Sequence, residues 1–178
     1  MKSFKTHLTR VIGDHKLDFE EMSTLLAEIE ACLNSRPLGV LPHNNDDGIE
    51  VLTPGHFLIG RPLQAIPDHP QSTRPIGLLR RWYLCQALVA HFWRRWRDEY
   101  ITALRNYSKW KSPNGNFQVG DVVVIKEDNL VTSRWPIAHI IETNVRTDGL
   151  VRVVTLKTRD GIYKRPVTKL ALLVPCEN

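Results

Sequence analysis

The first forty residues carry apolar side chains at the spacing of an α-helix. Between residues 2 and 12 they recur three and four positions apart, which predicts an amphipathic helix that Gly13 would end. A second helix is predicted after Asp18, because Asp18 and Glu21 have the spacing of a capping box. Pro37 cannot continue that helix. The apolar faces of the two helices consist of Phe4, Leu8, Val11, Ile12, Met22, Leu25, Leu26, Ile29 and Leu33.

Proline changes the pattern in the segment that follows. Seven of the eleven prolines fall within residues 37–79, so we expect residues 39–79 to form an extended connector. Thr53 followed by Pro54 is typical of a helix start, since proline suits the first helical position. One short helical turn is therefore predicted within the connector.

A long helical pattern then runs over roughly residues 77–109, and we assign residues 80–112 to this basic, aromatic-rich segment. A helix of that extent would be about 50 Å long, enough to bridge two modules. Its apolar stripe is wider than one partner surface needs. We expect Trp82, Trp93 and Trp96 to belong to that stripe and to the core rather than to a base-stacking platform.

The last third of the chain has the signals of short β-strands. Apolar runs over residues 122–125, 138–141, 151–156 and 167–174 are separated by turn residues. The dipeptides at Asp148 and Asp160 are both Asp-Gly, a strong hairpin signal. Five short strands over residues 115–175 predict a small SH3-like barrel. The fold class is thus α+β: two N-terminal helices, one long linking helix and a five-stranded β-barrel.

Positive charge is concentrated in the long helix. The whole chain has a net charge of +5, whereas residues 80–114 alone carry eight basic and two acidic side chains, a net of +6. Such a field favours a polyanionic partner, above all nucleic acid. The candidate phosphate contacts on this helix are Arg80, Arg81, Arg94, Arg95 and Arg97.

A second set of cations lies on or beside the two predicted hairpins. Strand alternation would turn Arg152 toward solvent, where it could meet phosphate. No base-reading motif accompanies these residues, so we expect DNA binding that ignores sequence. The set consists of Arg152, Lys157, Arg159, Lys164 and Arg165.

Several classes of protein are disfavoured by composition. Cys32, Cys85 and Cys176 are too few and too far apart for a disulfide scaffold or a zinc knuckle. No apolar run is long enough to span a membrane, and no signal peptide precedes the first helix. We expect a nuclear or cytoplasmic protein that is not secreted, with no cofactor, no bound metal, no membrane contact and no small-molecule substrate.

Ordered motifs along nearly all 178 residues resemble the integrases of Pao/BEL-type LTR retrotransposons. The longest is LTPGHFLIGRPL at residues 52–63, which resembles the tail that follows the integrase core. Residues 33–38 resemble the end of the last core helix, and residues 119–123 and 165–170 resemble the C-terminal domain. Further matches are Arg81, Trp82, Phe92, Trp93, Arg95, Trp96, Tyr100, Leu104 and Trp110.

The resemblance implies that residues 1–38 are the last two helices of a truncated RNase H-like catalytic core. Such cores transfer DNA strands with two aspartates and one glutamate on two divalent metals. By alignment the glutamate would fall about one turn before Lys2, and the aspartates further upstream. We therefore expect no catalytic residue and no enzyme activity in this chain. Lys2 and Lys5 match positions where integrases contact the DNA end.

The leading hypothesis is a non-catalytic C-terminal integrase fragment that binds DNA through its phosphates, alone, as a homo-oligomer or with a parent integrase core. The alternative is a protein-interaction module without nucleic-acid binding, which would use the barrel or a helix-mediated dimer. A modified-lysine reader would need an aromatic cage. The barrel offers only Phe117, Trp135 and Tyr163 for one.

Overall fold

The computed structural model describes residues 2–41, 49–63, 76–111, 116–127, 130–145 and 147–176. This part of the chain holds four α-helices, a two-stranded ribbon and a five-stranded antiparallel sheet, which confirms the α+β class. The helices are α1 (Lys2–Ile12), α2 (Phe19–Asn34), α3 (Pro54–Ile59) and α4 (Ile76–Lys111). The strands are β1 (Gly39–Val40), β2 (Val51–Leu52), β3 (Val122–Ile125), β4 (Ile137–Val145), β5 (Val151–Thr158), β6 (Gly161–Pro166) and β7 (Leu170–Val174), and a 3-10 turn, η1 (Val167–Lys169), precedes β7.

Helices α1 and α2 form where the sequence predicts them. Gly13 ends α1 with a positive φ of 51°, and its N–H donates to the Thr9 carbonyl at 3.0 Å. The Asp18 carboxylate accepts from the Glu21 N–H at 2.8 Å, and the Glu21 carboxylate accepts from the Asp18 N–H at 3.0 Å. The predicted capping box is therefore confirmed.

The predicted turn after Thr53 is helix α3. His56 completes its cap, since the Thr53 N–H donates to the His56 Nδ1 at 3.0 Å. Gly55 is needed for close packing there, because a Cβ at this position would lie 2.9 Å from the Leu63 nitrogen. The ribbon of β1 and β2 joins this segment to the end of α2.

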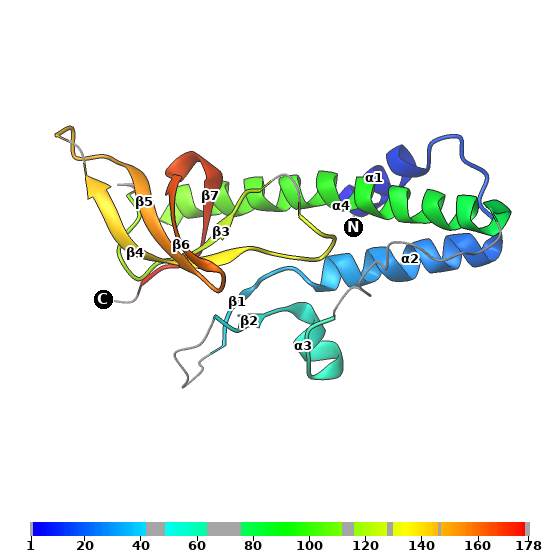
Figure 1. Cartoon of the computed structure of the whole chain (residues 1–178), viewed down its shortest axis with the longest axis horizontal. Coiled ribbons are helices and arrows are strands. Elements are labelled where there is room, and N and C mark those ends of the chain that lie inside the picture. Colours follow the sequence, from blue (N-terminus) through cyan, green and yellow to red (C-terminus); the bar gives the residue numbers. More distant parts are fainter. Residues whose placement is uncertain are drawn as a thin grey trace.

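Helix α4 is the axis of the molecule. Its 36 residues extend about 54 Å at the usual rise per residue. Helices α1 and α2 lie along its first half and the five-stranded sheet lies along its second half (Figure 1). Helix α2 runs parallel to α4, and α1 runs antiparallel to it.

The N-terminal helices bury their apolar faces on α4. The core there contains Val11, Leu25, Ile29, Cys32, Leu88, Val89, Phe92, Trp93 and Trp96, with Phe4, Leu8 and Leu33 packed at its border. Two predictions about this core are wrong. Leu26 is 39% exposed, because Cys32 rather than Leu26 lies on the α4-facing side of α2. Trp82 is 46% exposed, because it lies before the part of α4 whose aromatic side chains are buried.

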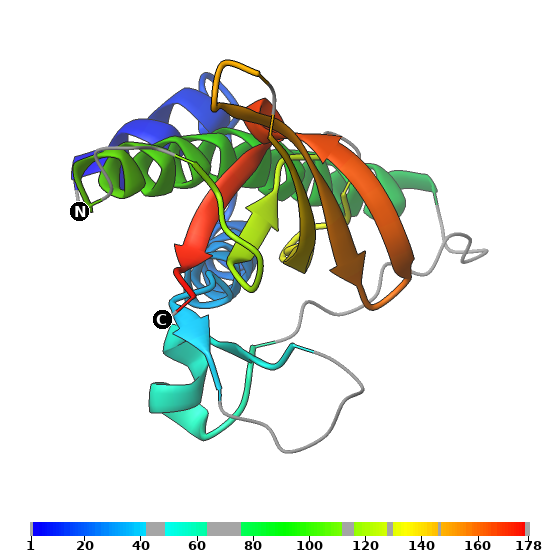
Figure 2. The ribbon, with the colours of Figure 1, turned by 90° about the vertical axis from the view of Figure 1, so that its left-hand side faces the viewer.

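The sheet has the strand order β6-β5-β4-β3-β7, and β6 and β7 lie at its opposite edges (Figure 2). Both predicted Asp-Gly hairpins are present, with positive φ at Gly149 (77°) and Gly161 (138°). The strand predicted at residues 138–141 is longer in the structure, because β4 continues to Val145 and its register with β5 shifts twice.

The five strands do not close into the predicted barrel. Among the described residues, β6 and β7 are not paired to each other. The chain crosses between these edges through η1, which contacts β5. Val167 of η1 packs on the core of the sheet. Its side chain therefore covers part of the core between the edge strands β6 and β7, which would pair with each other in a closed barrel.

Candidate nucleic-acid interface

Three of the predicted arginines on α4 are available to a partner. Arg80, Arg94 and Arg95 are exposed, and none of them forms a side-chain hydrogen bond or ion pair with another described residue. Their positions follow from the helical period, because the buried Trp93 and Trp96 fix the opposite face of α4 against α1, α2 and the β3–β4 loop. Charge on this face is therefore held on a rigid helix.

Arg81 is exposed but already engaged. Its guanidinium group contacts the Glu21 carboxylate through Nε and Nη2, and Nη2 also donates to the Lys16 carbonyl at 3.3 Å. The hydrogen bonds that Arg81 donates to the Glu21 carboxylate raise the pKa of its guanidinium. This residue ties the start of α2 to α4, so its charge is partly neutralised.

Arg97 is buried, unlike the other candidates on α4. It is 2% exposed, and its Nη2 lies 3.4 Å from the Asp98 carboxylate. Its Nε and Nη1 have no hydrogen-bond partner among the described residues. Because its face of α4 turns toward the sheet and not toward solvent, we leave Arg97 out of the candidate surface.

Three of the predicted cations of the sheet are exposed and form no ion pair with a described residue: Lys157 and Lys164 on its strands and Arg159 in the β5–β6 turn. Lys164 lies opposite Thr155, and Lys157 is two residues further along β5, so both lysines share the outer face of the sheet. Neither forms a side-chain hydrogen bond or ion pair with a described residue. They can therefore meet a polyanion without first breaking an internal contact.

The other two candidates on the sheet are paired. Arg152 is exposed, as predicted, and its Nη2 lies 2.8 Å from the Asp148 carboxylate. Arg165 is opposite the buried Val154, on the inner face, where it lies 3.3 Å from the Glu127 carboxylate and 5.6 Å from the centre of the Tyr163 ring. Of the two N-terminal candidates, Lys5 is exposed, and the side chain of Lys2 lies outside the described part of the chain.

The aromatic residues considered for a lysine-binding cage do not come together. Trp135 packs edge-on against Trp93, with 4.9 Å between ring centroids, and its indole N–H donates to the Ser35 hydroxyl at 3.2 Å. Phe117 packs on the core of the sheet, and only Tyr163 is exposed. Phe117, Trp135 and Tyr163 therefore do not form a cage for a modified lysine.

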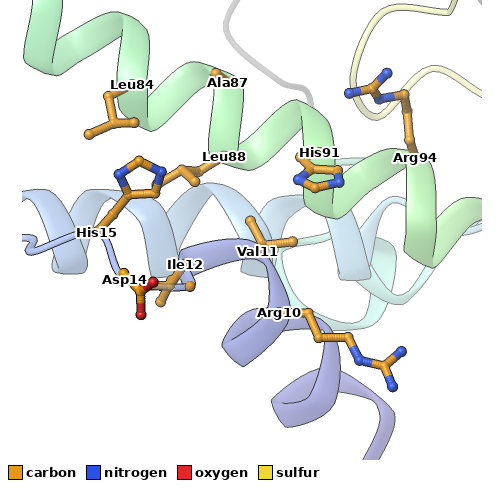
Figure 3. Close-up of a pocket in the computed structure, with 11 residues that line it drawn as sticks. Arg10, Val11, Ile12, Asp14, His15, Leu84, Ala87, Leu88, His91 and Arg94 are labelled. Atoms are coloured by element: carbon orange, nitrogen blue, oxygen red, sulfur yellow. The ribbon is translucent and has the colours of Figure 1, made fainter.

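A cleft between α1 and α4 contains polar residues that the sequence analysis did not select. Its volume is about 700 Å³, and it is lined by Arg10, Val11, Ile12, Gly13, Asp14, His15, Leu84, Ala87, Leu88, His91 and Arg94 (Figure 3). Arg94 was predicted from the charge of α4. Arg10, His15 and His91 were missed because they are far apart in the sequence and belong to no motif.

Burial affects the titration of two groups in the helical core. Desolvation raises the pKa of the Cys32 thiol to about 11, and it also raises the pKa of the Tyr100 hydroxyl. The Tyr100 hydroxyl donates to the Pro37 carbonyl at 2.5 Å. Among the described residues there is no cluster of His, Cys, Asp and Glu side chains with the geometry of a metal site, and no helix long and apolar enough to cross a membrane.

The chain belongs to a known protein family. The family described as "Family of unknown function (DUF5641)" matches residues 80–173, from the Arg80 turn of α4 to β7. The family segment thus contains all but the first turn of the long helix and nearly the whole sheet. No curated protein and no solved structure matches the chain.

Proposed function

We propose that this chain is the C-terminal part of a Pao/BEL-type LTR retrotransposon integrase, and that it binds DNA through phosphates without cutting it. The observation that carries the proposal is the exposed face of α4, where Arg80, Arg94 and Arg95 have no partner among the described residues. Phosphate contacts of this kind release counterions and supply affinity that does not depend on sequence.

Two structural features support the assignment to an integrase. Helices α1 and α2 both pack on α4, which fits the end of an RNase H-like core that continues into a linker. The strand order of the sheet is a four-stranded meander with the fifth strand returning beside the first, which fits an SH3-like domain although the sheet is open. The resemblance of residues 52–63 to the integrase tail adds a third argument.

The arrangement favours binding over base recognition. Guanidinium groups form paired hydrogen bonds with phosphate oxygens, and α4 holds its arginines on a straight rigid element. Lys157 and Lys164 add point charges on the outer face of the sheet. A nuclear or cytoplasmic location, and assembly with a second copy or with an integrase core, belong to the same proposal.

The first test compares two unrelated 20-base-pair duplexes by fluorescence anisotropy. The proposal expects equal dissociation constants within about two-fold for the unmodified chain. Arg94→Gln together with Arg95→Gln is expected to weaken both complexes by a similar factor, about ten-fold or more. Arg81→Gln is the matched control on the same helix, since that guanidinium is already engaged by Glu21. A strong preference for one duplex would overturn sequence-independent binding.

A protein-interaction role is the second candidate, favoured by one observation. Phe57, Leu58 and Ile59 at the end of α3 are 74%, 62% and 50% exposed. Consecutive exposed apolar side chains are characteristic of contact with another protein surface. Light scattering of the unmodified chain and of Phe57→Ser tests this role, which predicts an oligomer that the substitution dissociates.

A further inference from the structure

The cleft between α1 and α4 separates two kinds of chemistry along its length. Asp14 and His15 lie at one end, and Arg10, His91 and Arg94 lie at the other (Figure 3). Between the two ends the lining is apolar and includes the buried Val11 and Leu88 together with Ile12 and Leu84, which are half-buried. The cleft therefore offers an acceptor, a nonpolar floor and a cationic end in that order.

The turn after α1 creates this arrangement. Gly13 adopts a positive φ of 51°, a backbone conformation that glycine tolerates better than other residues. The His15 N–H then donates to the Ile12 carbonyl at 3.1 Å, and the His15 ring points back toward Leu84 and Leu88 of α4 (Figure 3). Residues from opposite sides of the cleft are thus positioned by backbone hydrogen bonds and not by each other.

Among the described residues, the basic groups of the cleft have no partner that would explain them as internal structure. The side chains of Arg10, His15, His91 and Arg94 make no hydrogen bond or ion pair with another described residue. In Figure 3 the two guanidinium groups lie on either side of His91 and point away from each other. Guanidinium groups so placed do not converge on one anion, but each can contact its own phosphate of a strand that passes His91.

We infer that this cleft binds an unpaired nucleotide of a nucleic-acid strand, which deepens the proposed function and rests on it. Phosphates on either side of the nucleotide contact Arg10 and Arg94, one each, and the base lies on the apolar floor with its face against the His15 ring. Histidine rings and apolar surfaces stack with unpaired bases, and basic groups follow the backbone beside them. The Asp14 carboxylate accepts a hydrogen bond from an amino group of the base.

A duplex cannot use the whole cleft, because its bases are already stacked and paired. Its phosphates would reach only the cationic end. We therefore expect a single strand to gain affinity from contacts to its bases that a blunt duplex lacks. Arginines of α4 outside the cleft, such as Arg95, would contact the phosphates of both single-stranded and duplex DNA.

The test measures binding of a fluorescein-labelled 20-nucleotide oligodeoxycytidine and of a blunt 20-base-pair duplex by anisotropy at one salt concentration. His15→Ala is expected to weaken single-strand binding at least five-fold and duplex binding less than two-fold. Arg10→Ala is expected to weaken the single strand by a similar factor. Arg61→Ala, which removes the same charge in the turn after α3, is the control and is expected to change neither by more than two-fold.

Each outcome separates the inference from the proposed function. If the unmodified chain binds neither probe, the proposed function fails and the inference fails with it. If both probes bind and the cleft variants leave single-strand affinity within two-fold, only the inference is overturned. Deoxycytidine monophosphate that competes at the concentrations effective for the oligonucleotide would overturn the assignment to a strand.

A crosslinking measurement on the unmodified chain tests the same inference without variants that could fold poorly. Photo-crosslinking of an oligonucleotide that carries 5-iododeoxyuridine, followed by mass spectrometry, is expected to mark peptides containing residues 10–15 or 84–91. Crosslinks confined to peptides of the sheet would place the unpaired bases elsewhere and overturn the inference.

Discussion

The Trp135 indole, in the loop between β3 and β4, lies edge-on against the Trp93 ring of α4, and 4.9 Å separates their centroids. The same indole contacts Trp96 and Tyr100, with centroid distances of 5.8 and 5.4 Å. Trp135 also borders the cluster in which Ile101 of α4 meets β3 and β7. Trp135 therefore takes part both in the packing of α4 on the N-terminal helices and in its packing on the sheet.

Trp135→Ala should destabilise the whole fold. Truncating a packed tryptophan usually costs about 3 kcal/mol or more, and here it also leaves the Ser35 hydroxyl without its indole donor. Urea unfolding should give a free energy of unfolding lower by about 3 kcal/mol. Trp82→Ala is the matched control, because Trp82 is half-exposed. This substitution should lower the free energy of unfolding by less than about 0.5 kcal/mol. Equal losses for the two variants would refute the linking role.

The capping box of α2 gives a second stability prediction. Asp18→Ala removes the acceptor of the Glu21 N–H and should lower the free energy of unfolding by about 1 kcal/mol. Asp18→Ser keeps a side-chain oxygen at the N-cap and should recover most of that loss. Thermal unfolding followed by circular dichroism measures both, and a Ser variant as unstable as the Ala variant would contradict the capping explanation.

Burial of Cys32 predicts a loss of stability in alkali. The thiol ionises near 9.0 when exposed and near 11 in the fold, so above pH 9 the unfolded chain releases its proton first. The stability that this protonated thiol contributes to the fold is fully present below pH 9 and is lost as the pH rises from about 9 to 11. Above pH 9 the free energy of unfolding should fall more steeply with pH for the unmodified chain than for Cys32→Ala. Parallel curves would contradict the prediction.

The same burial predicts which thiols react. Cys32 and Cys85 are 1% and 3% exposed, and desolvation raises the pKa of both, whereas Cys176 is exposed. At pH 8 iodoacetamide should label Cys176 first, because the thiolate is the reacting species. Mass spectrometry that finds Cys32 labelled as fast as Cys176 in the folded chain would show that α2 opens readily.

Arg95 and Arg97 are two residues apart and offer a direct comparison of exposed and buried charge. Arg95→Met should reduce the dependence of DNA affinity on salt by about one unit of slope, the usual effect of losing one phosphate contact. Arg97→Met should leave the slope unchanged, because this side chain is buried. It should also leave stability unchanged or higher, since an apolar side chain of similar size removes a buried charge. Equal changes in slope would show that Arg97 reaches DNA.

The sequence predicted the local elements well because their signals are local. The capping box at Asp18, the end of α1 at Gly13 and both Asp-Gly hairpins depend on a few neighbouring residues. Helix α4 was expected over residues 77–109 and spans Ile76–Lys111, since its apolar period continues without a break.

Features that depend on contacts between distant segments could not be predicted in this way. Nothing near Trp135 in the sequence indicates that it packs on α4, one hundred residues after its hydrogen-bond partner Ser35. Burial of Arg97 depends on where the sheet meets α4, and exposure of Trp82 depends on where α2 begins. The cleft could not be predicted for the same reason, because His15 and His91 come to line one cleft only in the fold.

A salt titration of the unmodified chain on a 20-base-pair duplex tests whether it binds DNA phosphates without regard to sequence. The logarithm of the binding constant is expected to fall linearly with the logarithm of the salt concentration. The expected slope is about −3 for three phosphate contacts and about −6 for six or seven. An unrelated duplex should give the same line. No binding at low salt, or affinity that salt does not change, would contradict the account.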